Sequence, residues 1–188
     1  MQDERPFRQY TEVLAETMRR VGEELQQPVT DVEAHVLSRS VGRWLPFSDA
    51  AESLRRLLTT FPVIVASNGD EVSLRQSTDL LGLEFTVTVT AEAVGAYKPS
   101  PRHFEAVAKI IDQRNIARSR HLHIANQIDQ DLRPAKSTGF LTCFIDRHLD
   151  PAGQLVTADQ SDFSPDLRFG SLTELTDALL GPAESDRR

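Results

Sequence analysis

The sequence predicts an α/β fold, in which a doubly wound parallel sheet is covered by helices on both faces and carries a small helical cap. Two observations predict it. From about residue 45 onward, short β-branched runs alternate with amphipathic helical patterns, which is typical of parallel strands joined by crossover helices. Before that point the periodicity is helical throughout. We therefore expect a helical cap portion over 1–44 and an α/β core over 45–188.

Length and composition limit the class of protein. The chain has 188 residues, 39% of them hydrophobic, which suits one domain or a core domain with a small appendage. The net charge of −7, without a run of Lys and Arg, argues against a nucleic-acid partner. No stretch approaches the roughly 20 apolar residues that span a bilayer, and the start of the chain lacks the apolar core of a secretion signal. We expect no membrane partner and a cytoplasmic location.

The expected cap consists of two amphipathic helices. The second begins with Thr30-Asp31-Val32-Glu33, where Thr30 can cap the helix and Glu33 can reach back to it, and it ends near Val41. These helices could pair between subunits, so a homodimer is one expectation. The first helix is entered through Pro6 and carries an apolar stripe of Phe7, Tyr10, Val13, Leu14, Met18, Val21 and Leu25.

The expected core elements alternate along the chain. The first helix is capped by Ser48 or Asp49 and runs to Leu58, and the others span 71–81, 102–112, 129–138 and 172–180. The strands are predicted at 63–66, 86–90, 121–125 and 142–145. The last of these strands contains Cys143, for which we expect a buried, inert thiol. A loop rich in Pro, Gly, Ser and Asp separates it from the terminal helix.

Polar residues follow three of these strands, at the edge of the sheet where α/β proteins bind ligands. Ser67 and Asn68, before Gly69, can offer a hydroxyl, an amide and backbone N–H groups to an anion, helped by the next helix N-terminus. Taken alone, the segment is better explained as a turn in which Asn68 and Asp70 cap that helix. The other two groups are Lys98-Pro99 and Asn126-Gln127, with Asp131 close behind.

Lys98 and Asp131 each have two interpretations. Pro99 and Pro101 stiffen the loop around Lys98, so its ammonium can be held in place to pair with a carboxylate nucleophile or a substrate anion. Taken alone, Lys98 is better explained as an exposed loop residue. Asp131 lies in the first turn of a helix, which favours a carboxylate by electrostatics alone, but it can also bind Lys98 or act as a general base.

Several motifs follow one another in a fixed order. They are Ser67-Asn68-Gly69, Gly95-Ala96-Tyr97-Lys98-Pro99-Ser100-Pro101 with Phe104, and Ile124-Ala125-Asn126 to Asp131 with Pro134-Ala135-Lys136-Ser137-Thr138-Gly139-Phe140. In this order the chain resembles the haloacid dehalogenase (HAD) superfamily, in particular type II 2-haloacid dehalogenase-like proteins. The resemblance covers nearly the whole chain, including Arg5-Pro6-Phe7-Arg8 to Leu14-Ala15-Glu16, Pro46-Phe47-Ser48-Asp49-Ala50, and Pro165-Asp166 before Phe169.

The resemblance implies an activity and a set of site residues. An Asp attacks the substrate carbon, or phosphorus in the phosphatase branches, and forms an ester that an activated water hydrolyses. The implied substrate is a small anion such as a 2-haloacid. By position, Ser67 and Asn68 would hold the nucleophile or the substrate carboxylate, and Lys98 would neutralise the carboxylates. Asp131 would support Lys98 and the water, and the implied substrate contacts are Gly69, Phe104, Asn126 and Gln127.

The resemblance also bears on metals. In phosphatase branches the strand before Asp131 ends in a second acid that helps to bind Mg²⁺, and here the neutral Asn126 takes that place. His121, His123 and Asp129 beside Asp131 do not have the arrangement of a metal site either. We expect no metal and no cofactor, and a metal-dependent phosphatase is the weakest of the alternatives.

One family element is missing from the chain. The family's nucleophile lies in a central, N-terminal strand followed by Phe-Asp-x-x-Gly-Thr, and no such segment occurs here. Asp3 and Asp31 lie in helical cap sequence and Asp49 resembles a helix cap, so none replaces it. We expect either a truncated version of a longer product or a chain that pairs the strands ending at Ser67 and Asn126 directly.

Other departures concern the substrate residues. Phe104 stands where dehalogenases can carry a Tyr, and Ile128 where they can carry an Asn. The first expectation is therefore an HAD-like hydrolase that gives no turnover as this chain. The alternative is a non-catalytic binding or regulatory protein that keeps the fold and an anion pocket.

Overall fold

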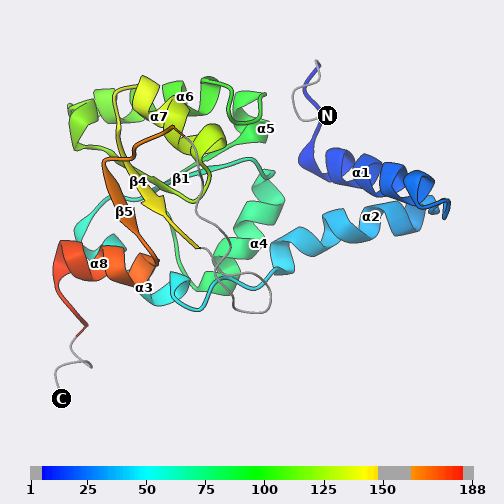
Figure 1. Cartoon of the computed structure of the whole chain (residues 1–188), viewed down its shortest axis with the longest axis horizontal. Helices are drawn as coiled ribbons and strands as arrows, with labels where there is room; N and C mark the ends of the chain where they lie inside the picture. Colours follow the sequence, from blue (N-terminus) through cyan, green and yellow to red (C-terminus); the bar gives the residue numbers. More distant parts are fainter. Residues whose placement is uncertain (1–5, 148–161, 184–188) are drawn as a thin grey trace. The chain divides into compact units, whose positions relative to one another are not determined.

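The computed structural model describes residues 6–147 and 162–183 (Figure 1). These residues belong to two compact units. Unit 1 contains 1–47 and 63–103, and unit 2 contains 48–62 and 104–188. The α/β pattern is divided between them, with one parallel sheet in each.

Unit 1 begins with two helices that lie side by side, α1 (Tyr10–Glu24) and α2 (Asp31–Ser40) (Figure 1). The predicted capping box is confirmed: Thr30 Oγ1 accepts from the Glu33 N–H at 3.3 Å, and the Glu33 carboxylate accepts from the Thr30 N–H at 2.8 Å. A short helix, η1 (Val41–Arg43), follows and contacts α4. The apolar stripe of α1 is only partly buried, since Leu25 at its end is 67% exposed.

The sheet of unit 1 consists of β1 (Ile64–Ser67) and β2 (Val87–Thr90), which pair in parallel from Ile64–Val87 to Ser67–Thr90. They are joined by α4 (Glu71–Leu81), whose bounds match the prediction. A one-turn helix, α5 (Ala91–Val94), follows β2 and was not predicted, because four residues are too few to show a helical period. The core of this unit groups Val13, Ala91 and Tyr97 with the partly buried Phe7 and Tyr10.

The sheet of unit 2 has three parallel strands in the order β3 (Leu122–Ala125), β4 (Leu141–Ile145) and β5 (Leu167–Phe169). The helices that contribute to this unit are α3 (Ala50–Thr60), α6 (Arg102–Gln113), η2 (Arg118–Arg120), η3 (Ile128–Leu132), α7 (Arg133–Ser137) and α8 (Leu172–Leu180). The bounds of α8 match the prediction. The first two residues of α6, Arg102 and His103, belong to unit 1.

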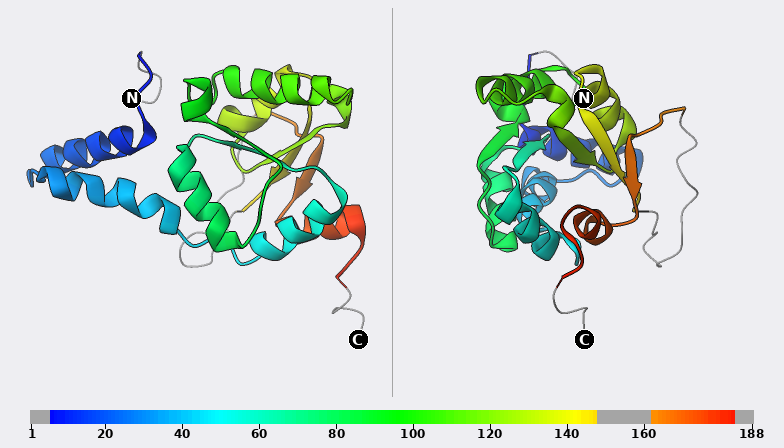
Figure 2. Two further views of the ribbon diagram at one scale, coloured as in Figure 1. Left: turned by 180° about the vertical axis from the view of Figure 1, so that it is seen from behind. Right: turned by 90° about the vertical axis from the view of Figure 1, so that its left-hand side faces the viewer.

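Alternate residues of β4 face two different cores. Figure 2 shows the ribbons of β4 in yellow, β5 in orange and α8 in red from two further directions. Phe144 packs with Ile128 and Leu132 of η3, whereas Cys143 and Ile145 pack with Leu175 of α8. Both faces of this sheet are therefore covered, as a doubly wound fold requires. Cys143 is fully buried, as predicted.

The predicted helix over 129–138 is a wide π turn, η3, followed by the short α7. Leu132 N–H donates to the Gln127 carbonyl, five residues earlier, at 3.2 Å. Pro134 has no N–H, so it cannot continue an ordinary helical ladder at this point. The wide turn places Asp131 and Leu132 inside, where both are buried.

The capping role expected of Asp49 is wrong for α3. Asp49 is the residue before α3, but its carboxylate makes no cap bond there. It accepts instead from the Leu172 N–H of α8 at 2.8 Å and from Arg147 at 2.9 and 3.0 Å. The side chain thus caps a helix more than a hundred residues away in sequence, which no local pattern could indicate.

The strand pairing also differs from expectation. β5 lies in the segment that was expected to be a loop; the Asp166 carboxylate, just before it, accepts from the Thr142 N–H of β4 at 2.8 Å. Over 6–147 and 162–183, the strands form two sheets rather than one. Ladder bonds join β1 to β2 in one sheet, and β4 to both β3 and β5 in the other. The expectation that the strands ending at Ser67 and Asn126 pair directly is therefore wrong for these residues.

Asp3 and the polar tail from residue 184 lie outside the described residues. Among the helices that are described, none has the length and apolar character needed to cross a membrane.

Candidate functional site

A tight turn, Ser67-Asn68-Gly69, ends β1 in unit 1. Ser67 Oγ accepts from the Gly69 N–H at 3.0 Å, so the serine hydroxyl closes the turn on itself. The same hydroxyl still has its own proton to donate. A Cβ at residue 69 would lie 3.3 Å from Ser67 Oγ, a closer contact than most Cβ atoms make, so a larger residue there would require the hydroxyl to shift.

The N-terminus of α4, next to this turn, is already occupied by carboxylates. Asp70 accepts from the Ser73 N–H at 2.8 Å, and Glu92 accepts from the Glu71 N–H at 3.0 Å. The capping role expected of Asp70 is confirmed. These two amides are therefore not available to an exogenous anion, and the expected help from this helix does not come from them.

The Asn68 side chain does not cap α4 but bridges to the loop that follows β2. Its Oδ1 accepts from the Lys98 N–H at 2.7 Å, and its Nδ2 donates to the Lys98 carbonyl at 3.4 Å. Lys98 is 9% exposed, and its Nζ donates to the Ala66 carbonyl at 3.0 Å. The next peptide bond, Lys98–Pro99, is cis. The ammonium is therefore held at the end of β1, beside the Ser67-Asn68-Gly69 turn.

The residue before Lys98 joins this loop to the segment that precedes α1. Tyr97 is buried, and its hydroxyl donates to the Arg8 carbonyl at 2.8 Å. Its ring stacks on Phe7 with centroids 5.2 Å apart. Burial, reinforced by Tyr10 and by the Asp70 carboxylate, raises the pKa of Tyr97 to about 12, so this phenol stays protonated and serves as a donor.

His103 is a site residue that the sequence interpretation missed. It lies in the first turn of α6, is wholly buried, and its Nε2 is 3.1 Å from the Ser67 carbonyl oxygen. A signal was present: His103 falls on the apolar stripe of α6 that includes Phe104, Val107 and Ile111, all buried. A polar side chain on a core-facing stripe needs a hydrogen-bond partner, which predicts a specific contact.

In unit 2, Asp131 lies in η3, behind the end of β3. It is 7% exposed, and its Oδ1 is 3.6 Å from His123 Nε2. Phe104 is fully buried and its ring lies against His123, with centroids 5.4 Å apart. The expected pairing of Asp131 with Lys98 joins the two units and stays a prediction.

Asn126 and Gln127 follow β3 and are exposed. The Gln127 carbonyl accepts from the Asp131 N–H at 3.3 Å and thereby closes the turn that leads to η3. In this region an exposed amide, rather than a carboxylate, stands at the strand end. Over the part of the chain that is described, no three His, Cys, Asp or Glu side chains form a group that could hold a metal ion. The side-chain amides of Asn126 and Gln127 are neutral, so they do not fit the position at which the phosphatase branches use a carboxylate to bind Mg²⁺.

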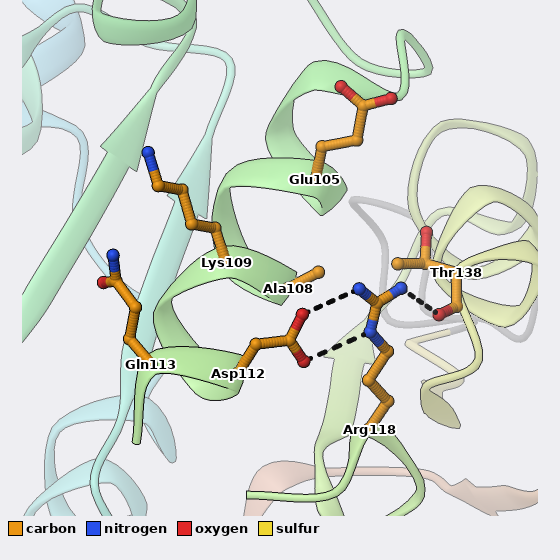
Figure 3. Close-up of a pocket in the computed structure, with 7 residues that line it drawn as sticks. All are labelled: Glu105, Ala108, Lys109, Asp112, Gln113, Arg118 and Thr138. Atoms are coloured by element: carbon orange, nitrogen blue, oxygen red, sulfur yellow. Dashed lines mark hydrogen bonds and ion pairs between the residues drawn. The ribbon is translucent and has the colours of Figure 1, made fainter. Parts of the chain in front are cut away.

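A hollow of about 410 Å³ occurs elsewhere in unit 2 (Figure 3). Across it, the Arg118 guanidinium donates to the Asp112 carboxylate at 2.8 and 3.3 Å and to the Thr138 carbonyl at 3.4 Å. Arg118 and Thr138 precede β3 and β4, so the hollow lies at the amino ends of these strands, opposite Asn126 and Gln127. It is lined by Glu105, Ala108, Lys109, Asp112, Gln113, Arg118 and Thr138.

The structure thus groups the predicted residues in two sets. Ser67, Asn68, Gly69 and Lys98 come together in unit 1, with His103 added. Phe104, Asn126, Gln127 and Asp131 belong to unit 2, with His123 added. Each set lies at or behind the carboxyl end of a parallel strand, β1 or β3.

No protein-family model matches this chain, and no curated protein matches its sequence. Solved structures do match. The L-2-haloacid dehalogenase from Xanthobacter autotrophicus with chloropropionic acid covalently bound has a TM-score of 0.77 at 18% identity, covering 94% of this chain and 78% of that one. A defluorinating L-2-haloacid dehalogenase has a TM-score of 0.79 at 22% identity, over 93% and 71% of the two chains. A HAD phosphatase from Thermococcus onnurineus has a TM-score of 0.60 at 22% identity, over 86% and 69%. The chain therefore has the HAD-like α/β fold.

Proposed function

We propose that this chain is an HAD-like hydrolase component whose unit 1 binds a small anionic substrate such as a 2-haloacid. The observation that carries the proposal is Lys98, a lysine that is 9% exposed and held by Ala66 and Asn68 at the end of β1. Burying an ammonium costs free energy unless it is paired with opposite charge or bonded to polar groups. Lys98 Nζ is held by the Ala66 carbonyl, at the end of the strand that the Ser67-Asn68-Gly69 turn follows, and a fixed cation there suits a carboxylate.

The reaction that the family resemblance implies would use an aspartate supplied to this site. The carboxylate oxygen attacks the carbon that carries the halogen, a C–O bond forms, and the halide leaves with the bonding electron pair. Water then adds to the ester carbonyl and loses a proton to a base. The ester C–O bond breaks, which regenerates the aspartate and releases a 2-hydroxy acid. Lys98 would stabilise the negative charge of the carboxylates throughout.

Two candidate nucleophiles, Asp31 before the core and Asp49 within it, do not suit this role. Asp31 is exposed and forms an ion pair with Arg19 at 2.6 Å, and Asp49 is bonded to Arg147 and Leu172. A carboxylate that is already paired with a guanidinium is a poor nucleophile. We therefore propose that the chain by itself binds the substrate without turning it over.

The test is a titration of the purified 188-residue chain with 2-chloropropionate, followed by a chloride-release assay. We expect saturable binding that Lys98→Met weakens by about tenfold or more, and no chloride release above the protein-free rate. Lys109→Met, an exposed lysine of α6, is the matched control and should bind like the unmodified chain. Absence of binding, or binding that Lys98→Met leaves unchanged, would overturn the proposal; chloride release would overturn only the statement that the chain lacks a nucleophile.

A non-catalytic binding protein is the second candidate. It is favoured by the ion pairs that already occupy Asp31 and Asp49, the first with Arg19 and the second with Arg147. It predicts the same dependence of binding on Lys98, but no turnover even when a peptide carrying the family's Phe-Asp-x-x-Gly-Thr element is added. Chloride release restored by that peptide would support the hydrolase instead.

A metal-dependent phosphatase is disfavoured because the neutral Asn126 stands where the phosphatases carry an acid that helps to bind Mg²⁺. If the chain released phosphate from a phosphomonoester only when Mg²⁺ was present, the phosphatase would be favoured over the dehalogenase-like hydrolase.

A further inference from the structure

His103 is buried against the end of β1, where the candidate anion site begins. Its side chain is 0% exposed, and Nε2 lies 3.1 Å from the Ser67 carbonyl oxygen. A carbonyl oxygen can only accept, so the hydrogen bond requires the proton on Nε2. A wholly buried imidazole costs free energy unless such bonds offset it, which indicates that this contact fixes the ring in place.

The bond from His103 sets the orientation of one peptide plane. In a trans peptide, the carbonyl of one residue and the N–H of the next point in opposite directions. The Ser67 carbonyl points toward His103, so the Asn68 N–H points away from it. The preceding plane is set in the same way, because Lys98 Nζ donates to the Ala66 carbonyl at 3.0 Å. Two side chains of the 98–103 segment therefore orient two consecutive peptide planes at the end of β1.

The donors of the turn fall into two groups. The Gly69 N–H is used inside the protein, because it donates to Ser67 Oγ at 3.0 Å. Within residues 6–147 and 162–183, the Ser67 hydroxyl proton and the Asn68 N–H are the donors of this turn for which the structure shows no acceptor. Rotation of the Ser67–Asn68 peptide would remove one of them from the site.

We propose that His103 is a positioning residue: it holds the Ser67–Asn68 peptide so that the Asn68 N–H faces the anionic group of the substrate. This inference rests on the proposed function, since it assigns that group to the same site. His103 itself does not touch the substrate. Its effect passes through the Ser67 carbonyl.

The experiment compares His103→Phe with His103→Gln. Phe keeps a planar ring of similar size but has no donor, whereas the Gln amide can place an N–H near the position of Nε2. We expect His103→Phe to weaken 2-chloropropionate binding by about tenfold and His103→Gln to restore it to within about threefold. In ligand-free protein, the NMR shift of the Asn68 amide should move in His103→Phe and return toward its original value in His103→Gln. His35→Gln, a partly exposed histidine of α2, is the control and should change neither readout.

The outcomes separate this inference from the proposed function. If Lys98→Met abolishes binding but folded His103→Phe binds like the unmodified chain, the positioning role is overturned and the anion site stands. If the unmodified chain does not bind 2-chloropropionate, the anion site fails. The Asn68 amide shift then decides the role of His103 alone, and an unchanged shift overturns it. Should His103→Phe not fold, His103→Asn replaces it, because Asn is too short to reach the Ser67 carbonyl, and equal behaviour of Asn and Gln overturns the proposal.

Discussion

The side-chain amide of Asn68 spans both backbone groups of Lys98, accepting from its N–H at 2.7 Å and donating to its carbonyl at 3.4 Å. One side chain at the end of β1 therefore satisfies two backbone groups of a loop thirty residues later. Lys98 donates in return to the Ala66 carbonyl of β1. The strand end and the loop thus fix each other, and the position of the ammonium depends on an amide that never needs to contact a substrate.

Asn68→Ala should lower the free energy of unfolding by about 1–3 kcal/mol, because two partly buried backbone groups lose their partner. Asn68→Asp should fall between Ala and the unmodified chain, since a carboxylate can accept from the Lys98 N–H but cannot donate to its carbonyl. Urea unfolding followed by circular dichroism measures both changes. Gln113→Ala, at the exposed end of α6, is the control and should change the free energy by less than about 0.5 kcal/mol. Equal stability of Asn68→Ala and the unmodified chain would contradict the bridge.

Asp49 should supply stability that depends on its charge. Burial raises its pKa, but the Arg147 guanidinium and the Leu172 N–H together outweigh burial and bring the pKa below the ordinary value of 3.8. A carboxyl group of this kind stabilises the folded state fully above its unfolded pKa, and this contribution is lost as the pH falls through the lower, folded pKa.

Asp49→Asn keeps an acceptor for the Leu172 N–H but removes the charge beside Arg147. At pH 7 we expect a loss of about 1–3 kcal/mol in the free energy of unfolding, because both side chains of the pair are largely buried. Below pH 3.8 the unmodified chain should lose this advantage, so the two unfolding curves should converge. A difference that stays constant from pH 7 to pH 3 would show that the charge is not responsible.

Local signals account for the elements that sequence predicts well. α4 and α8 have the predicted bounds because Asp70 and Ser171 cap them at one end and Gly82 and Gly181 follow them at the other. β5 has only three residues, and its position depends on Asp166 bonding to Thr142, which are far apart in sequence. Neither a period nor a turn signal marks such a strand.

The candidate site shows the same division. Its strand ends and its polar residues could be predicted, because they follow β-branched runs in an α/β order. The partners of those residues could not. In the sequence, Asn68 could equally cap the following helix or bind the backbone of a distant loop. Only the fold brings the loop with Lys98 within hydrogen-bonding distance of its side chain. His103 differs, because a histidine on an apolar helix stripe was visible in the sequence and required a partner.

Cys143 should be nearly unreactive in the folded protein. Its side chain is fully buried, and burial raises the pKa of the thiol to about 11, so little thiolate forms at neutral pH. As this is the chain's single cysteine, labelling with a thiol reagent reports on this site alone. We expect slow labelling at pH 7 that becomes complete within the mixing time in concentrated urea. Rapid labelling without denaturant would show that β4 opens readily.

His121 should make folding stability depend on pH above the range in which Asp49 acts. Burial first, and then the neighbouring His123, lower the pKa of His121 from 6.5 to about 4. Between pH 6.5 and pH 4 the unfolded chain binds a proton at His121 that the folded chain does not. The contribution of His121 to the free energy of unfolding is therefore fully present above pH 6.5 and is lost as the pH falls toward 4. The ring is partly exposed, which reduces the effect to about 1–2 kcal/mol.

His121→Phe removes this titration while keeping an aromatic ring against Phe140, whose centroid lies 4.5 Å from that of His121. Its free energy of unfolding should therefore vary less between pH 7.5 and pH 4.5 than that of the unmodified chain, as measured by urea unfolding at about one-unit intervals. Asp49→Asn should leave the slope in this window unchanged, because its own effect begins below it. If His121→Phe retains the full slope, the proton uptake belongs to another group, and the burial of His121 is not what couples folding to pH near neutrality.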